Sequence, residues 1–514
     1  MKELQIFGRD YTEYRFFKAE LDGSPIWEQD ENGANIAALM ELALGKVLTE
    51  TDDGERYRLD PNLRVSKRDV DGNPVFRTET IKKAEFAKRC PLVGVFRFPV
   101  TRGELGEKLR KALPDREYLV TIRLRSRLDA SGDTETPEHR EENHALCYML
   151  EKAWPDLFLH GMPKDSGTLE ALWEMLLVYQ FRFLLLRLRR TGMYRGYVRY
   201  ERNDDRFRGV PDVPRHIREN AGRKNGRIAY SCRERTADNT LNHFILRAWQ
   251  MLERRFPVHS AQAARPDSAL ARVLRELRSA APSWQTPPDH RLLMENLRPV
   301  SHPYYQPYER MRQLCVRIFR REGVQALLHD ETENVEGFLI YLPDLFEDYV
   351  ESVLYAGLPR CTIEAQSGRQ CFGREIRPDF IVRPYHAAPW VMDAKCRPRF
   401  ADLTRPGEKD GNVVKDYMGE LCKLLRDMEA ALPEEPARRG ALIVPDLQPS
   451  VDGVRVLRAM EQQAESFLFG RGGARTSRVD MILLPFFRHE GMEYGLWKDK
   501  MEKIQGIALE ESEE

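Results

Sequence analysis

Short apolar runs bounded by polar turns dominate the first 160 residues of the chain and predict β-strands. The runs at 93–98 and 118–124 are rich in β-branched and aromatic residues. From about residue 165 to 260 the apolar positions recur mostly at helical spacing, and 169–188 reads as a core helix. Prolines cluster between 261 and 307, which predicts a bent connection between domains.

The C-terminal part has a different order of elements. A helix start is expected at 341–344, an apolar stripe at helical spacing runs from Leu345 to Leu354, and strand-like runs follow near 380 and 390. Another helical stripe covers 413–428, and buried strands are expected at 439–445 and 480–485. Helices that alternate with strands in this way indicate an α/β layer with a mixed sheet.

The fold class that follows is a multi-domain α/β protein. Three domains are predicted: a β-rich domain over 1–160 that docks a partner or contacts DNA, a mainly helical domain over 161–307, and an α/β domain over 308–514.

Two acidic residues and a lysine accompany the strands near 380 and are the strongest chemical signal in the chain. Asp379 precedes one apolar run, and Asp393 lies in the next with Lys395 two positions later. Side chains two residues apart lie on the same face of a strand, so Asp393 and Lys395 should point the same way. The segment 383–389 contains Pro and Ala residues and predicts a turn, and the antiparallel hairpin it closes would set the two acids side by side. Carboxylates bind hard divalent ions, and an ammonium group beside them suits phosphodiester hydrolysis.

A third acid is expected from the preceding helix. Pro343 and Asp344 are typical of a helix start, with Asp344 as the capping residue. Glu347 falls at the edge of the apolar stripe, whereas Asp348 and Glu351 fall further toward solvent. Glu347 is therefore the acid predicted to join the site.

These motifs, with Pro378 before Asp379 and Ala394 between Asp393 and Lys395, resemble the PD-(D/E)xK nuclease superfamily. The resemblance implies a restriction-endonuclease-like α/β domain and an Mg²⁺-dependent endodeoxyribonuclease, with Mn²⁺ as an alternative ion. It implies that Glu347, Asp379, Asp393 and Ala394 hold the metal, and that Lys395 assists the nucleophilic water or the phosphate. The alternative interpretation of the same strings is a surface hairpin with one ion pair.

The middle of the chain carries further motifs in a fixed order. They are Gly192–Tyr197, Phe207–Gly209, Pro214–Asn220 and Cys232–Asn242. With a PD-(D/E)xK domain behind them, they resemble the McrC family of restriction-endonuclease subunits over roughly 165–445. The resemblance implies an McrB-like AAA+ GTPase or ATPase motor as partner. The chain contains no G-x-x-x-x-G-K-[ST] motif, so the partner is expected to hydrolyse the nucleotide.

Two groups of residues in the middle region have structural roles as their simplest interpretation. Thr236, Asp238, Asn239 and Asn242 are expected to cap and bracket the start of a helix. His216 is expected to be a surface or hydrogen-bonding residue, because no second histidine stands at metal-ligand spacing.

Formal net charge is zero, yet one stretch is strongly basic. Residues 182–235 hold 16 Arg and Lys against 6 Asp and Glu, with aromatic residues between them. Such a stretch can neutralise phosphates and stack on bases of double-stranded DNA, or it can be a surface paired with acids elsewhere. The candidate DNA contacts are Arg195, Arg199, Arg208, Arg215 and Lys415.

Other features narrow the class of protein. No stretch approaches the roughly 18 uncharged apolar residues of a membrane span, and the start of the chain lacks a signal-peptide pattern. The eight cysteines are scattered without a C-x-x-C pair, which argues against structural zinc and a disulfide framework. A cytoplasmic location is expected.

Three functions are compatible with these features. The first is an endonuclease subunit that cuts double-stranded DNA with an AAA+ motor partner, in restriction or anti-phage defence. The second is an adaptor that docks on an AAA+ ring and stimulates its hydrolysis, with little cleavage of its own. The third is a stand-alone DNA repair nuclease.

Overall fold

The structure is a computed structural model. It describes residues 2–27, 33–60, 63–65, 67, 77–86, 89–101, 103–113, 117–129, 144–154, 169–223, 226–321, 335–366, 368–371, 374–385, 389–396, 439–446, 455–457 and 478–485. The chain divides into two compact units, Met1–Leu172 with Glu333–Glu514, and Trp173–Thr332. The three-domain division expected from the sequence stays a prediction.

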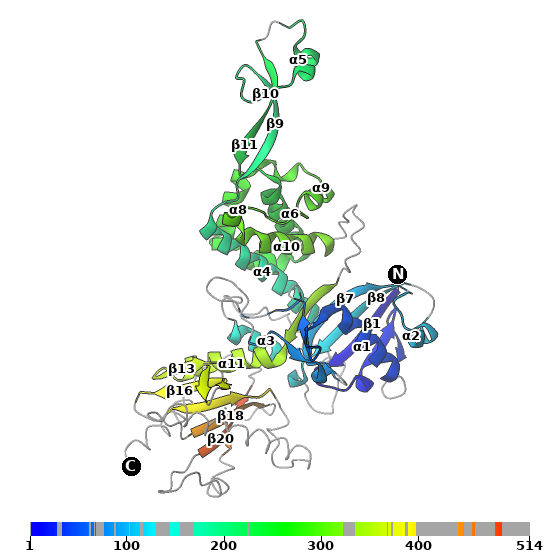
Figure 1. The fold of residues 1–514 in the computed structure, drawn as a ribbon, viewed down its shortest axis with the longest axis vertical. Coiled ribbons are helices and arrows are strands. Elements are labelled where there is room, and N and C mark those ends of the chain that lie inside the picture. Colours follow the sequence, from blue (N-terminus) through cyan, green and yellow to red (C-terminus); the bar gives the residue numbers. More distant parts are fainter. Residues whose placement is uncertain are drawn as a thin grey trace. The chain divides into compact units, whose positions relative to one another are not determined.

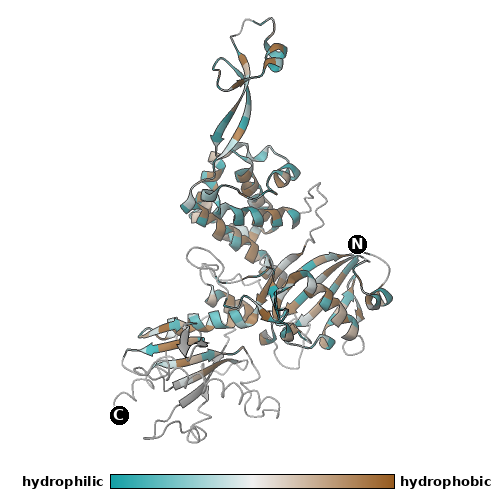
Figure 2. Ribbon diagram, viewed as in Figure 1, coloured by the Kyte–Doolittle hydropathy of each residue, from teal (hydrophilic) through white to brown (hydrophobic). Residues whose placement is uncertain are grey.

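The first unit contains a six-stranded sheet in the order β12-β7-β8-β1-β2-β3. The strands are β1 (Lys2–Arg9), β2 (Lys18–Leu21), β3 (Ser24–Trp27), β7 (Leu92–Val100), β8 (Tyr118–Arg125) and β12 (Glu336–Tyr341). β1 and β8 are parallel and the other neighbours antiparallel. The apolar residues of the sheet share one core with helix α1 (Gly33–Val47), and both are largely hydrophobic (Figures 1 and 2). The strands predicted at 93–98 and 118–124 are confirmed as β7 and β8.

β12 is distant in sequence from the other strands of this sheet, and two glycines allow it to pair with β7. Gly94 and Gly337 have φ near +143° and +144°, a region that side chains rarely adopt. A Cβ on Gly94 would lie 2.2 Å from the carbonyl oxygen of Phe338, and one on Gly337 would lie 2.1 Å from that of Val95. The close approach of β7 and β12 therefore requires glycine at both positions.

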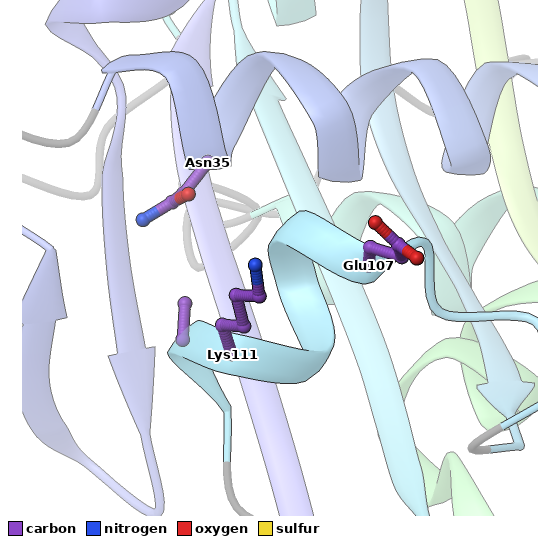
Figure 3. A pocket seen from close by; sticks show the side chains of 4 residues that line it. Asn35, Glu107 and Lys111 are labelled. Atoms are coloured by element: carbon purple, nitrogen blue, oxygen red, sulfur yellow. The ribbon is translucent and has the colours of Figure 1, made fainter.

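Smaller elements complete this part of the unit. They are η1 (Tyr14–Phe16), β4 (Leu48–Glu50), β5 (Arg56–Leu59), β6 (Ile81–Lys82), η2 (Lys83–Phe86), α2 (Glu107–Ala112), η3 (Arg127–Asp129) and α3 (His144–Ala153). A surface hollow of about 540 Å³ lies where Asn35, Glu107, Lys111 and Ala112 meet. Lys111 stands between Asn35 and Glu107 there (Figure 3), and none of the predicted site residues lines this hollow.

A second six-stranded sheet in the same unit has the order β13-β16-β17-β18-β20-β19. Its strands are β13 (Cys361–Ala365), β16 (Phe380–Pro384), β17 (Trp390–Ala394), β18 (Arg439–Asp446), β19 (Arg455–Leu457) and β20 (Arg478–Pro485). Between β13 and β16 in the sequence, β14 (Arg369–Cys371) and β15 (Arg374–Ile376) form a separate two-stranded sheet. β16 and β17 form the predicted antiparallel hairpin, while β17, β18 and β20 are parallel. The sheet is mixed, as predicted, and helix α11 (Leu342–Gly357) contacts β13 and β17. The helix expected at 413–428 lies outside the described residues.

The second unit is helical around α6 (Thr240–Arg255), whose buried face includes Phe244 and Trp249. The helices that share the unit are α4 (Leu169–Thr191), α7 (Pro257–Ala263), α8 (Ala269–Ala280), α9 (Asp289–Glu295) and α10 (Pro307–Arg321), with short η5 (Pro282–Gln285) and η6 (Pro303–Tyr305). The ring centres of Phe319 in α10 and Phe244 are 4.3 Å apart, and those of Trp249 and Phe181 are 5.3 Å apart, with the rings tilted in both pairs. The core helix predicted at 169–188 is confirmed. The bent connection predicted over 261–307 is wrong, because this segment is largely helical and lies within the second unit. Pro282, Pro303 and Pro307 begin η5, η6 and α10, and α9 follows Pro288.

A projecting β-hairpin in this unit was not predicted from the sequence. β9 (Gly196–Asp204) pairs with β11 (Ile228–Thr236) over nine positions, and β10 (Val210–Pro211) and α5 (Val213–Asn220) fill the turn. Figure 1 shows this hairpin module, residues 196–236, extending away from the helices of its own unit. β9 alternates half-buried and exposed residues over most of its length, whereas β11 buries Ala229, Tyr230 and Cys232 near its start. Charged residues along both strands hid the period of two.

The fold class is thus confirmed as a multi-domain mixture of helices and several sheets.

Candidate active site

The hairpin of β16 and β17 brings the two predicted aspartates together. Asp379 immediately precedes β16, and Phe380 pairs with Met392, so the next residue along β17, Asp393, lies beside Asp379. The main-chain N–H of Ala394 donates a hydrogen bond of 2.8 Å to Oδ2 of Asp379. A further hydrogen bond joins the carboxyl groups of Asp379 and Asp393.

Lys395 joins this pair from the end of β17. Its Nζ lies 2.8 Å from Oδ2 of Asp393, and its main-chain N–H donates to the carbonyl of Ile443 at 2.8 Å. The parallel partner β18 therefore holds the backbone of Lys395 while the side chain returns to the acids. The prediction that Asp393 and Lys395 project to the same side is confirmed.

Glu347 reaches the same place from α11. Its pKa responds to the charges of both Asp379 and Lys395, which places it within their electrostatic range. Gln366, which sequence reasoning missed, connects the two elements. Its Nε2 donates to Glu347 at 2.9 Å, and its main-chain N–H donates to the carbonyl of Asp379 at 2.8 Å. No local motif marks Gln366, whose backbone has a φ of 48° after β13.

Two expectations about α11 are wrong. Asp344 does not cap the helix, which starts after Tyr341 without a side-chain cap; instead it accepts from Arg64 at 2.8 Å and from the N–H of Thr78 at 3.3 Å. Asp348 does not face solvent and is only 4% exposed. The reason is that residues from the N-terminal part of the unit, among them α3, cover the side of α11 that the helical stripe left polar.

The covering residues also include ion partners that sequence reasoning missed. Arg77 Nε donates to Asp348 at 2.7 Å and lies 3.9 Å from Glu347, and Trp154 Nε1 donates to Asp348 at 3.0 Å. Such long-range pairs leave no pattern along the chain.

The site gathers several carboxylates in a largely buried position, and burial and neighbouring charges shift the pKa values of its residues. Burial raises the pKa of Asp379 to about 7, and the neighbouring Asp393 adds to the shift. Burial and the charge of Asp379 also raise the pKa of Glu347 well above its usual value, against the opposing effect of Arg77. Burial would lower the pKa of Lys395, but Asp393 and Asp379 outweigh it, so this lysine stays protonated.

A hard divalent metal needs several oxygen donors gathered in one place. Among the described residues no three Asp, Glu, His or Cys side chains are already gathered as a metal site. The donor set nevertheless fits a hard cation. It consists of the carboxylates of Glu347, Asp379 and Asp393, and burial with the charge of Asp393 raises the pKa of Asp379, a shift that a bound divalent ion would oppose.

Four of the five candidate DNA contacts lie in the other unit, on or beside the hairpin module. Arg195, Arg199 and Arg208 are exposed. Arg215 instead donates to the carbonyls of Arg202 and Tyr230, at 2.9 and 2.7 Å, and so holds α5 on the hairpin. Lys415 lies outside the described residues.

The polar motif before α6 has the structural role expected of it. Asn239 is the N-cap and accepts from the N–H of Asn242 at 3.2 Å, and Thr236 Oγ1 accepts from the N–H of Asp238. His216 is a hydrogen-bonding residue, as expected, since its Nδ1 accepts from the N–H of Ala229 at 3.3 Å.

Two general findings concern the described part of the chain. None of its helices is long and apolar enough to cross a membrane. Among its cysteines, Cys90, Cys232 and Cys315 are buried free thiols.

Comparison with known proteins gives one family. The family model for the McrBC 5-methylcytosine restriction system component matches residues 115–409. No match is found among curated proteins. A chain of the refined half-complex from the tetradecameric assembly of Thermococcus gammatolerans McrB AAA+ hexamers with bound McrC is 15% identical, with a TM-score of 0.44, over 98% of this chain and 100% of that chain. A chain of the cryo-EM structure of the Thermococcus gammatolerans McrBC complex is 17% identical, with a TM-score of 0.27, over 69% of this chain and 88% of that chain.

The resemblance found in the sequence motifs is confirmed by the family match. Since the matched segment is more than half of the chain, this protein belongs to the family of McrBC 5-methylcytosine restriction system components.

Proposed function

We propose that this chain is the McrC-like nuclease subunit of a restriction system, a PD-(D/E)xK endonuclease that cuts double-stranded DNA with Mg²⁺ or Mn²⁺. One observation carries the proposal. Helix α11 and the β16–β17 hairpin bring Glu347, Asp379, Asp393 and Lys395 into one acidic site. The antiparallel β13-β16-β17 strands, followed by parallel β18 and preceded by α11, support a restriction-endonuclease-like domain.

Each residue of the acidic site has a distinct role in this proposal. Asp379, Asp393, Glu347 and the carbonyl of Ala394 would hold the ion, which when bound supplies positive charge that polarises water and the scissile phosphate. Lys395 remains charged because two carboxylates raise its pKa, and its ammonium stabilises negative charge that develops on the phosphate. Asp393 orients that ammonium through the 2.8 Å ion pair.

The decisive test is cleavage of plasmid DNA with Mg²⁺, with and without an McrB-type motor protein. The Asp393→Asn variant keeps the size of the side chain but lacks the charge, so cleavage should fall by at least about a thousandfold. Asp267→Asn, an exposed aspartate before α8, is the matched control and should cleave normally. Full cleavage by Asp393→Asn would refute the assignment.

The partner follows from the family rather than from the site. McrC of Thermococcus gammatolerans is bound to McrB AAA+ hexamers, and we propose a motor of that class, in the cytoplasm, as the partner of this chain. The same partner supports the second candidate, an adaptor that stimulates the ring with little cleavage of its own.

The hairpin module supplies the observation that favours an adaptor role. Val210, Val213 and Ile217 at its tip are 67%, 58% and 59% exposed, although apolar side chains gathered on one small surface usually contact a partner. Figure 2 shows hydrophobic and hydrophilic residues side by side on α5. We propose that this apolar tip docks on the AAA+ ring.

One pair of variants tests docking through the tip, and the wild-type protein separates the two candidate functions. Val213→Asp should reduce stimulation of the motor's nucleotide hydrolysis at least about tenfold, because a charge is then desolvated at the contact. Val258→Asp places the same charge on a valine of α7 that is 67% exposed, against 58% for Val213, and should leave stimulation unchanged. Stimulation without any cleavage by the wild-type protein would favour the adaptor, and equal stimulation by both variants would exclude docking through the tip.

A further inference from the structure

The N-terminal part of the first unit reaches the acidic site along three separate connections. The first is covalent, because β12 is a strand of the N-terminal sheet and runs directly into α11. Glu347 therefore lies about one and a half turns from a strand held by β7. The glycine pair Gly94 and Gly337 fixes how closely that strand can lie.

Arg77 is the second connection and touches the metal-binding side of the site. Its side chain is 7% exposed, donates to Asp348 at 2.7 Å and pairs with Glu351. The same guanidinium lies 3.9 Å from Glu347 and 5.7 Å from the ring centre of Phe380, the residue after Asp379. One arginine thus contacts the helix that presents Glu347 and the strand that presents Asp379.

Arg127 is the third connection and touches the lysine side. Its Nη2 donates to the carbonyl of Cys396, the residue after Lys395. Buried Asp10 accepts the main-chain N–H of Arg127 at 2.6 Å, and its Oδ2 lies 3.5 Å from Nε, while the guanidinium lies 4.2 Å from the ring centre of Tyr11. Arg127 is thereby fixed before it reaches the end of β17.

A shared acceptor links Arg127's surroundings with the start of α11. The hydroxyls of Tyr11 and Tyr341 donate to the same oxygen of Glu85, at 3.0 and 3.2 Å. Tyr341 is the residue immediately before α11. A continuous series of contacts therefore joins Arg127 to the start of α11.

We propose that Arg77 and Arg127 are positioning residues of the nuclease site, so that the N-terminal sheet completes this site in addition to any contact it makes with a partner. The proposal rests on the function proposed above. Arg77 sets where Glu347 stands relative to Asp379, and Arg127 sets where Lys395 stands relative to Asp393. Neither arginine touches the reacting atoms.

The roles differ, so the two conservative variants should fail differently. Arg77→Lys keeps the charge but cannot contact Asp348, Glu351 and Glu347 together, because a single ammonium replaces the planar fork. Its affinity for Mn²⁺, measured by calorimetry without DNA, should fall about 10–100-fold, the usual effect of removing a residue that supports a metal ligand. Cleavage should recover largely at saturating metal.

Arg127→Lys should show the opposite pattern. We expect Mn²⁺ affinity within about threefold of wild type and a cleavage rate at saturating metal reduced about 10–100-fold, since the ammonium of Lys395 is displaced. The split between affinity and rate would not arise from a general loss of packing. Stimulation of the motor should remain at the wild-type level in both variants.

The matched control is Arg312→Lys. Arg312 is also a buried arginine, 9% exposed against 7% for Arg77, and it pairs with Glu309 at 2.5 Å in the other unit. It should change neither Mn²⁺ affinity nor rate. Wild-type protein that neither binds Mn²⁺ nor cuts DNA would refute the proposed function itself. Wild-type protein that does both, with Arg77→Lys and Arg127→Lys behaving like Arg312→Lys, would refute the positioning roles alone; if Arg77→Lys fails to fold, the rate of Arg127→Lys decides.

Discussion

Arginines serve the acidic site and the hairpin module in opposite ways. Arg77 and Arg127, beside the site, are largely buried and paired with carboxylates or a carbonyl. On the hairpin module, Arg199 and Arg208 are exposed on or next to a thin ribbon of strands. Arg77 and Arg127 therefore fix geometry, whereas Arg199 and Arg208 present charge to the surroundings. Arg215 is the exception on the hairpin module, because it holds α5 through two carbonyls.

The difference shows how environment decides what a charge contributes. Buried opposite charges compensate for the water they have lost, so removing one member leaves the other uncompensated and costly. Exposed charges are screened and contribute little to stability, but they attract a charged partner. Variants of the first kind should change chemistry, and variants of the second kind should change association.

Among variants that compare the two regions, the largest effect should come from Lys395→Met. The change removes the only cation that pairs directly with Asp393 in the described part of the site, so phosphate charge loses its stabilisation. We expect DNA cleavage at saturating Mg²⁺ to fall at least about 100-fold, as for loss of other groups that stabilise developing charge. Lys83→Met, in the exposed pair with Glu50 at 2.6 Å, is the control and should cleave normally. Comparable rates for both variants would remove the distinction between the two environments.

A smaller effect should appear in the pH dependence of stability. The pKa of Asp379 is about 7 in the folded protein against a usual 3.8, mainly because of burial. Between these values the folded protein retains a proton that the unfolded chain releases, so the free energy of unfolding falls as pH rises from about 4 to 7. Scanning calorimetry of metal-free protein should show Tm falling by a few degrees over this range relative to Asp379→Asn. Parallel curves for the two proteins would contradict the raised pKa.

The smallest effect on folding should follow changes on the hairpin module. The double variant Arg199→Ser with Arg208→Ser should leave Tm unchanged and weaken binding of DNA of any sequence. The slope of log affinity against log salt should drop by about 1 for each phosphate that the protein no longer neutralises. The control is Arg291→Ser, because the side chain of Arg291 in α9 is also exposed (66%), and this variant should leave DNA binding unchanged. An unchanged salt slope in the double variant would assign the basic stretch to a surface that does not bind DNA.

Local patterns were sufficient where one apolar face dominates. The strands at 92–100 and 118–125, the helix at 169–191 and the β16–β17 hairpin were predicted from periodicity and turn residues. Local patterns failed for 261–307, where several prolines begin helices, and for β9 and β11, whose charged residues obscured the alternation.

Local sequence patterns were enough to identify the acids and the lysine that meet at the acidic site. Asp379, Asp393 and Lys395 are close along one hairpin, so strand alternation and a short turn suffice to predict their approach, and a helical stripe suffices to select Glu347. Only the tertiary structure decided what surrounds them. Gln366, Arg77 and Arg127 reach the site through folding of distant segments, and Asp348 is buried because other parts of the first unit cover α11. Periodicity describes one element at a time, whereas burial and ion pairing depend on which other elements pack against it.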